Sequence, residues 1–95
     1  MKYTWNAHKN EINIRKHGID LGDVPDMFNY PMLVGLDNRE DYGEERWLGI
    51  GFLGNIIAVI VFTEQEEDSI HLISARKAIA HERKKYQIEV ANGLG

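Results

Sequence analysis

The spacing of apolar residues changes about halfway along the chain, from helical periodicity to the periodicity of strands. Apolar and small side chains alternate from Arg46 to Leu53, which predicts a strand with two different faces. Gly54-Asn55 is a two-residue hairpin signal, and Ile56–Thr63 is apolar throughout, as is typical of a central strand. An acidic turn at Glu64–Asp68 leads to a third predicted strand at Ser69–Ser74.

The N-terminal part predicts a short strand followed by a well-delimited helix. The strand is expected over Tyr3–Trp5 and the helix over Ala7–His17. Asn6 is a favourable N-cap residue, because its side-chain oxygen can accept a hydrogen bond from a free backbone N–H of the first turn. Gly18 is suited to end the helix in a left-handed conformation.

A second short helix is predicted between the first helix and the strands. Asp20 is its expected N-cap, and apolar residues at helical spacing continue as far as Phe28. Met32–Val34 then predicts a brief strand, and Asp37–Glu45 a polar loop. The helical segments thus precede the strand-forming half of the chain, and this order favours a fold in which helices pack on a sheet.

Helical spacing returns at the C-terminal end, where a helix is predicted over Arg76–Ala91 with Ser74 as its N-cap. On such a helix Arg76 and Arg83 share one stripe, and a second, apolar stripe contains Ile79, Tyr86 and Val90. The order of elements predicts one α+β domain over residues 1–95. We expect a small antiparallel sheet with two N-terminal helices and a C-terminal helix packed on it.

Composition restricts the class of protein. The chain has 95 residues, of which 43% are hydrophobic and 27% charged, and these values favour a globular domain. It has no cysteine, which excludes disulfides, thiolate zinc sites and cysteine nucleophiles. The longest apolar run, Ile56–Phe62, is far shorter than the ~20 residues of a membrane helix. Charged residues begin at Lys2, so we expect no signal peptide and a cytoplasmic protein.

Charge is segregated along the chain, although the net charge is only −4. Residues 1–19 carry four basic residues and one acidic residue, and residues 69–95 carry five basic and two acidic residues. Residues 20–45, in contrast, carry eight acidic residues and one arginine. Basic ends around an acidic middle are compatible with a local anion-binding surface. Nucleic-acid binders are more often basic overall, so charge alone leaves the partner open.

The first predicted helix places Lys9, Asn13, Lys16 and His17 on one stripe. Two cations, an amide and an imidazole in this arrangement are able to hold a phosphate and to transfer a proton near neutral pH. The alternative is a solvated face on which Lys16 and His17 stabilise the C-terminal end of the helix dipole.

Two further groups of residues are candidates for anion chemistry. The first contains Arg76 and Arg83 together with the lysines Lys77, Lys84 and Lys85. These residues form either a phosphate site or an ordinary charged helix surface. Glu44-Glu45-Arg46 precedes one strand and Thr63-Glu64 ends the next. Such strand ends suit a catalytic carboxylate or a phosphate-binding arginine, but they also suit a solvated edge or a local ion pair. The four histidines have no metal-site spacing, so neither a metal nor a nucleotide cofactor is expected.

Together these landmarks resemble the BrnT family, the toxins of bacterial type II toxin–antitoxin pairs. The resemblance extends over nearly the whole chain, and its most specific parts are the WxxxKxxxNxxKHG and ISARKA segments. The matching residues, in family order, are Trp5, Lys9, Asn13, Lys16-His17-Gly18, Glu44-Glu45-Arg46, Thr63-Glu64, Ile73–Ala78, Glu82-Arg83 and Tyr86.

The resemblance implies a RelE-like fold and a ribonuclease that cuts RNA without a metal or cofactor. It also implies neutralisation by a BrnA-like antitoxin in a heteromeric complex, expected to be a heterotetramer, which binds operator DNA through the antitoxin. No membrane partner is expected. The alternative is an inactive relative that serves only as a binding module in an antitoxin–DNA repressor complex.

Metal-free RNA cleavage assigns expected roles to these residues. Three arginines are candidates for stabilising charge on the phosphoryl group: Arg46, Arg76 and Arg83. Three residues are candidates for proton transfer: His17, Glu45 and Glu64. Four lysines are candidates for holding phosphates of the RNA backbone: Lys9, Lys16, Lys77 and Lys84. Tyr86 either stacks on a base or closes the core, and its apolar stripe favours the core.

Overall fold

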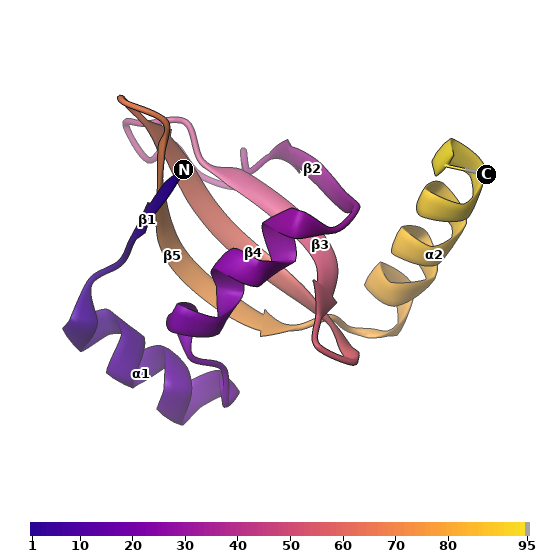
Figure 1. Ribbon diagram of the computed structural model, residues 1–95, viewed down its shortest axis with the longest axis horizontal. Coiled ribbons are helices and arrows are strands. Elements are labelled where there is room, and N and C mark those ends of the chain that lie inside the picture. Colours follow the sequence, from indigo (N-terminus) through magenta and orange to yellow (C-terminus); the bar gives the residue numbers. More distant parts are fainter. Residues whose placement is uncertain (95) are drawn as a thin grey trace.

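One five-stranded sheet organises the protein in the computed structural model, which describes the backbone of residues 1–94 and the side chains of residues 1–90. The strand order is β1-β5-β4-β3-β2 (Figure 1). Along the chain the elements are β1 (Lys2–Thr4), α1 (Ala7–His17), the 3₁₀ helix η1 (Leu21–Asn29), β2 (Met32–Leu36), β3 (Trp47–Leu53), β4 (Ile56–Gln65), β5 (Ser69–Lys77) and α2 (Ala80–Leu94).

The sheet is mixed, so the prediction of a small antiparallel sheet holds for four of its five strands. Strands β2 to β5 form the expected antiparallel meander, with the hairpin at Gly54-Asn55. The three residues of β1, however, pair in parallel with the start of β5, and Thr4 lies opposite His71. This pairing joins segments 67 positions apart and has no local signal, which is why the pattern of residues does not reveal it.

Helix α1 begins and ends where the sequence predicts. The side chain of Asn6 accepts a hydrogen bond from the backbone N–H of Lys9, which satisfies one of the free donors of the first turn. Gly18 has a φ angle of 71°, the left-handed conformation that glycine adopts at little cost, and its N–H returns to the carbonyl of Ile14.

The second predicted helix is a 3₁₀ helix. Asp20 caps it as expected, accepting a hydrogen bond from the N–H of Gly22 at 2.8 Å. Its buried residues, Leu21, Val24 and Met27, recur every three positions, the period at which side chains align on a 3₁₀ helix. The same residues at three-residue spacing were compatible with one face of an α-helix, so the pattern did not separate the two forms.

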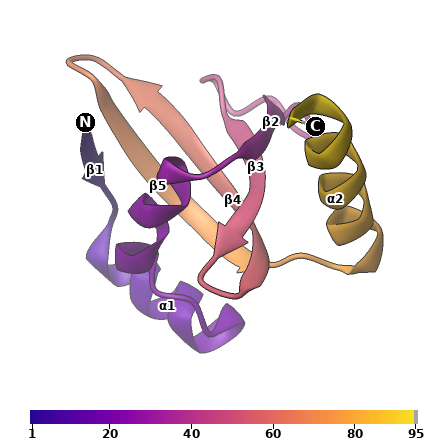
Figure 2. The same ribbon diagram turned by 45° about the vertical axis from the view of Figure 1, so that its right-hand side comes forward.

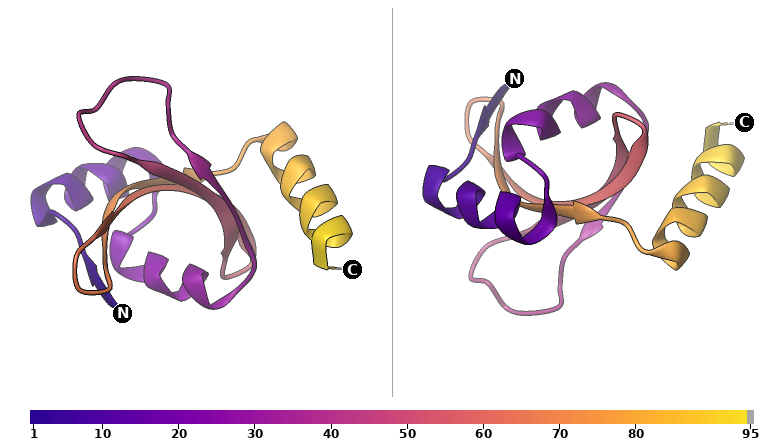
Figure 3. Two further views of the ribbon diagram at one scale, coloured as in Figure 1. Left: turned by 90° about the horizontal axis from the view of Figure 1, so that it is seen from above. Right: turned by 90° about the horizontal axis from the view of Figure 1, so that it is seen from below.

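The two faces of the sheet carry separate apolar clusters. The inner face packs against η1 and includes Ile60, Phe62, Leu72 and Ala75. The outer face includes Ile50 and Val59, and at one end it packs against Tyr86 of α2. Figures 2 and 3 show η1 and α2 on opposite sides of the curved sheet, with α1 beside β5.

Glycine in β3 leaves room for the side chain of Met32 from the neighbouring strand β2. A Cβ atom at Gly49 would lie 2.6 Å from the sulfur of Met32, which is closer than real Cβ contacts allow. The alternation of glycine with apolar residues in β3 therefore has a packing function: it makes room for a methionine over the sheet.

The predicted start of the C-terminal helix is wrong. β5 continues through Arg76 to Lys77, because it stays paired with β4 past an irregularity at Val61/Phe62, and Ser74 is a strand residue instead of an N-cap. Helix α2 begins at Ala80, where Glu82 accepts a hydrogen bond from the N–H of Ile79, as in a capping box. Arg76 and Arg83 therefore lie on different elements.

The predicted apolar stripe of this helix is only partly confirmed. Tyr86 is 3% exposed, and its hydroxyl donates a hydrogen bond to the carbonyl of Pro31 at 2.8 Å, so it closes the core. Its ring also meets Phe52 edge to face. Ile79, in contrast, is 53% exposed, because it precedes the first turn of α2. Within residues 1–94, no helix has the length and apolar character needed to cross a membrane.

Candidate active-site cleft

A cleft of about 500 Å³ lies where the N-terminal segment meets one end of the sheet. The residues around it come from five parts of the chain. They are Trp5, Asn6 and Lys9 from the segment before α1 and its first turn, Leu21 from the start of η1, Glu44 and Arg46 from the loop before β3, Gln65 from the end of β4, and His71, Leu72 and Ile73 from β5.

Two of the predicted phosphate-binding residues, Lys9 and Arg46, line this cleft together. Lys9 is placed there because Asn6 fixes the first turn of α1 directly after β1. Arg46 directly precedes β3, and its neighbour Trp47 pairs with Phe62, so Arg46 comes opposite Thr63. The fold therefore places these two cations in one cleft.

The guanidinium of Arg46 is held over an aromatic ring. Its central carbon lies 4.1 Å from the centroid of Tyr42, a cation–π contact. The nearest carboxylate oxygen, on Glu44, is 4.0 Å from Nε, which is too long for a hydrogen bond. Arg46 Nε and Thr63 Oγ1 are both buried without a hydrogen-bond partner among the described side chains. Two buried polar atoms near this end of the sheet thus remain unpaired among the described residues.

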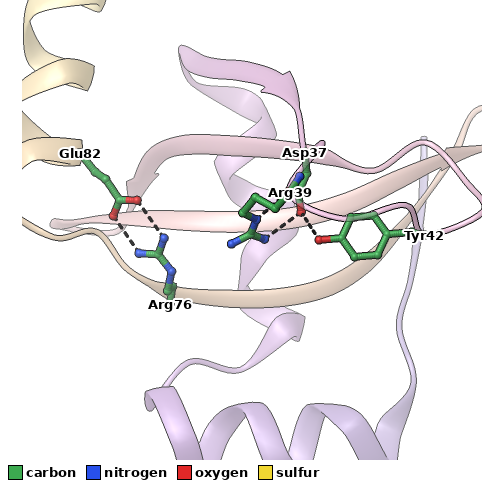
Figure 4. A network of polar contacts seen from close by, with 5 residues as sticks. All are labelled: Asp37, Arg39, Tyr42, Arg76 and Glu82. Atoms are coloured by element: carbon green, nitrogen blue, oxygen red, sulfur yellow. Dashed lines mark hydrogen bonds and ion pairs between the residues drawn. The ribbon is translucent and has the colours of Figure 1, made fainter.

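Hydrogen bonds at both ends of the loop and inside it hold the segment that carries Tyr42 and Arg46. The N–H of Asp37 bonds the carbonyl of Arg46 at 2.7 Å, which brings the two loop ends together. The buried carboxylate of Asp37 accepts hydrogen bonds from Arg39 at 2.7 and 2.8 Å and from the Tyr42 hydroxyl at 3.3 Å (Figure 4). These bonds, above all those from Arg39, lower the pKa of Asp37 to about 2. The loop is therefore ordered around an ionised carboxylate.

Arg76 is occupied by a carboxylate of α2. It donates two parallel hydrogen bonds of 2.8 Å to Glu82 (Figure 4), which lower the pKa of Glu82 to about 2 and raise the pKa of Arg76. Arg76 lies opposite Val59 on the outer face of the sheet. The positive charge of Arg39 acts in the opposite direction and limits the rise in the pKa of Arg76. The pair ties the end of β5 to the first turn of α2.

The other basic residues predicted for the site lie apart from the cleft. Arg83 donates a hydrogen bond to the carbonyl of Ala78 at 2.7 Å, and with Lys77 it lines a separate hollow of about 350 Å³. Lys84 is exposed on α2. Figure 1 shows α2 on the opposite side of the molecule from α1, so the basic ends of the chain do not form one continuous patch.

The predicted stripe on α1 is divided between surface and core. Asn13 is buried, donating to the carbonyl of Ile19 at 2.8 Å and accepting from the N–H of Ala75 at 3.2 Å. Lys16 and His17 belong to the last turn of α1, where cations favour the helix dipole. The stripe therefore does not present its amide to a ligand.

The predicted carboxylates are both exposed at the ends of strands. Glu45 adjoins two residues of the cleft, Glu44 and Arg46, without lining it. Glu64 pairs with Ile70, a residue of the inner face. Because neighbouring residues of a strand lie on opposite faces, Glu64 and Thr63 are on different faces of the sheet. Neither carboxylate has a hydrogen bond to a side chain of the cleft among the described residues.

Sequence reasoning missed His71 and did not assign Trp5 to the site. His71 lines the cleft, and its Nδ1 is hydrogen bonded to Thr4 Oγ1 at 2.8 Å. The only signal for His71 was a polar residue within an apolar strand, and its meaning depended on the parallel pairing with β1. Within residues 1–90 no group of three or more histidine, aspartate and glutamate side chains is close enough to hold a metal ion.

The fold and the cleft define a class: a small α+β protein with cations, an imidazole and an indole gathered at one end of a five-stranded sheet. A family model described as "Ribonuclease toxin, BrnT, of type II toxin-antitoxin system" matches residues 5–82. The chain belongs to this BrnT family.

A solved structure supports the same assignment. The chain is similar to the crystal structure of the Brucella abortus ribonuclease toxin BrnT, with a TM-score of 0.66 and 28% sequence identity. The match covers 84% of this chain and 99% of the Brucella chain. A comparison with curated proteins gave no match.

Proposed function

We propose that this chain is the toxin of a type II toxin–antitoxin pair and acts in the cytoplasm as a metal-independent endoribonuclease. In this proposal residues 1–95 act as one toxin domain of RelE-like type. Membership in a family described as ribonuclease toxins supports the activity. The observation that carries the location is the meeting of Lys9 and Arg46 in one cleft.

The chemistry requires a site that holds phosphate and moves protons. The 2′-hydroxyl of the RNA attacks the adjacent phosphorus, and charge on the phosphoryl oxygens rises in the transition state. Arg46, braced on Tyr42, offers a guanidinium that matches phosphate geometry, and Lys9 adds a second cation. Trp5 is 36% exposed at the same cleft, where an indole is able to stack on a base.

The other predicted catalytic and binding roles stay predictions, and the position of each residue relative to the cleft supports some of them more than others. Among the residues expected to transfer protons, Glu45 is the one adjacent in sequence to the cleft. His17 and Lys16 lie two turns further along α1 from Lys9. Arg76 has its guanidinium engaged by Glu82, and Arg83 by a backbone carbonyl, so we assign both a mainly structural role.

The partner in this proposal is a BrnA-like antitoxin, which forms a heteromeric complex with the toxin. The complex binds operator DNA through the antitoxin. The support is the family description, which places these ribonucleases in type II toxin–antitoxin systems. Such a partner also accounts for the acidic middle of the chain, which offers a surface to a basic segment.

Expression of the chain alone tests the activity. We expect growth arrest and degradation of total RNA on induction, and neither effect when the antitoxin is produced as well. The variants Lys9→Ala and Arg46→Ala should abolish the arrest, whereas Arg76→Ala/Arg83→Ala should retain it if the protein accumulates. Intact RNA and normal growth with soluble wild-type protein would refute the proposal.

The second candidate is an inactive binding module in an antitoxin–DNA complex. The observation that favours it is apolar exposure: Val34 is 52% and Leu36 55% exposed on β2, at an edge of the sheet. They border a groove of about 470 Å³ that also includes Lys85 and Glu89 of α2. This candidate predicts tight binding of the antitoxin without any cleavage of RNA.

A further inference from the structure

A row of four polar side chains crosses the end of the sheet beside the cleft. Thr4 pairs with His71, and His71 pairs with Thr63. Arg46 directly precedes β3, where Trp47 pairs with Phe62, the residue before Thr63. Residues paired across strands share one face, so Thr4, His71 and Thr63 belong to the outer face, away from the core residues Leu72 and Phe62. The row brings together two hydroxyls, an imidazole and a guanidinium from four strands and their ends.

His71 is fixed within this row by one of its two ring nitrogens. Its Nδ1 lies 2.8 Å from Thr4 Oγ1, the only hydrogen bond to the His71 side chain among the described residues. Because that bond occupies Nδ1, Nε2 is the nitrogen available to a ligand in the cleft that His71 lines. An oriented imidazole with one free nitrogen is the arrangement that general acid–base catalysis uses.

Among the described residues, His71 is the only histidine that lines this cleft. His8 is exposed, 4.0 Å from Glu11, His17 ends α1, and His81 is exposed on α2. The cleft adds the cations of Lys9 and Arg46 to the imidazole, so one compartment contains both phosphate-binding and proton-transferring groups. Thr63 Oγ1 and Arg46 Nε are buried without a hydrogen-bond partner among the described residues, so this row contains two polar groups that the fold leaves unsatisfied.

We propose that His71 is the general base of RNA cleavage and that Thr4 is its positioning residue, an inference that rests on the proposed ribonuclease function. Nδ1–H donates to Thr4 Oγ1, and Nε2 accepts the proton of the RNA 2′-hydroxyl. The 2′-oxygen forms its bond to phosphorus while the bond from phosphorus to the 5′-oxygen breaks. The 5′-oxygen takes a proton from the Lys9 ammonium. The products are a 2′,3′-cyclic phosphate and a 5′-hydroxyl.

Steady-state kinetics of the full chain test this assignment on a short RNA in which the cleavage position has been mapped. We expect His71→Ala to lower kcat by roughly 10²–10⁴-fold, with KM within about threefold of the wild type. Thr4→Val should lower kcat by a smaller factor, and Thr4→Ser, which keeps a hydroxyl, should restore it. His81→Ala is the matched control, with unchanged kinetics, and thermal melts of every variant verify folding.

The same RNA with sulfur in place of the bridging 5′-oxygen identifies which proton His71 moves. A thiolate leaves without protonation, so a lost general base lowers the rate on both substrates, whereas a lost general acid lowers it only on the oxygen substrate. Recovery of His71→Ala on the sulfur substrate would overturn the assignment as base. Equal kcat for folded His71→Ala and wild type would overturn any role in proton transfer. Failure of the wild type to cleave RNA would overturn the proposed function as well.

Discussion

The side-chain oxygen of Asn13 accepts a hydrogen bond of 3.2 Å from the backbone N–H of Ala75, which lies 62 positions further along the chain. The amide nitrogen of the same side chain donates to the carbonyl of Ile19 at 2.8 Å. One buried amide thus connects α1, the turn that follows it and β5. Because the first turn of α1 carries Lys9, this connection also places a cleft residue relative to the sheet.

Removal of this amide should destabilise the fold. Asn13→Ala leaves two buried backbone groups without partners, and we expect the free energy of unfolding to fall by about 2–3 kcal/mol. Urea denaturation measures the change. Arg15→Ala, an exposed position on the same helix, should change stability by less than about 0.5 kcal/mol. Equal stability of Asn13→Ala and wild type would contradict the structural role of the amide.

Stability should decrease in acid because two carboxylates have lowered pKa values. Asp37 and Glu82 shift from 3.8 and 4.5 to about 2, so their hydrogen bonds stabilise the folded state fully above about pH 4.5. That stabilisation is lost as the pH falls towards 2. We expect a contribution of about 1–2 kcal/mol for each carboxylate, since the paired arginines are partly exposed.

Thermal melts between pH 2 and 6 check this prediction. Asp37→Asn should be less stable than the wild type at pH 6 and should lose less stability on acidification. Glu66→Gln, an exposed position in the acidic turn, should follow the wild-type curve. A variant curve parallel to that of the wild type would show that Asp37 does not account for the acid dependence.

The hydroxyl of Tyr86 should contribute to stability and not to RNA binding. Tyr86→Phe removes the bond to Pro31 and should cost about 1 kcal/mol, whereas Tyr86→Ala should cost about 3–5 kcal/mol by leaving a cavity. Tyr30→Phe, at an exposed position, is the control. If Tyr86→Phe kept its stability but bound RNA more weakly, the ring would have a role as a base-stacking surface instead.

Local signals explain which elements could be predicted from the sequence. Asn6 and Gly18 delimit α1 because caps act on the adjacent turn, and Gly54-Asn55 predicts the hairpin for the same reason. The start of the C-terminal helix was misplaced because Ser74 is also suited to capping. Its place in β5 is decided by pairing with Val61 of β4, a contact that the local pattern does not contain.

The candidate site was predicted only in part, because its residues meet through non-local contacts. Lys9 and Arg46 were chosen for their charge, and the fold unites them. His71 was missed, since it depends on the parallel pairing of β1 with β5, and the two arginines of the predicted C-terminal site are separated by the end of β5. Residue type suggested the candidates, whereas strand register decided which residues line the cleft.

The most direct test of the account is cleavage of a defined RNA by the purified chain in the presence of EDTA, compared with Lys9→Ala, Arg46→Ala and the exposed control Arg15→Ala. We expect the wild type and Arg15→Ala to produce fragments ending in a 2′,3′-cyclic phosphate. Each cleft variant should be slower by roughly 10²–10³-fold while remaining folded. Cleavage at the wild-type rate by both folded cleft variants, or no cleavage by the wild type, would contradict the assignment of RNA cleavage to this cleft.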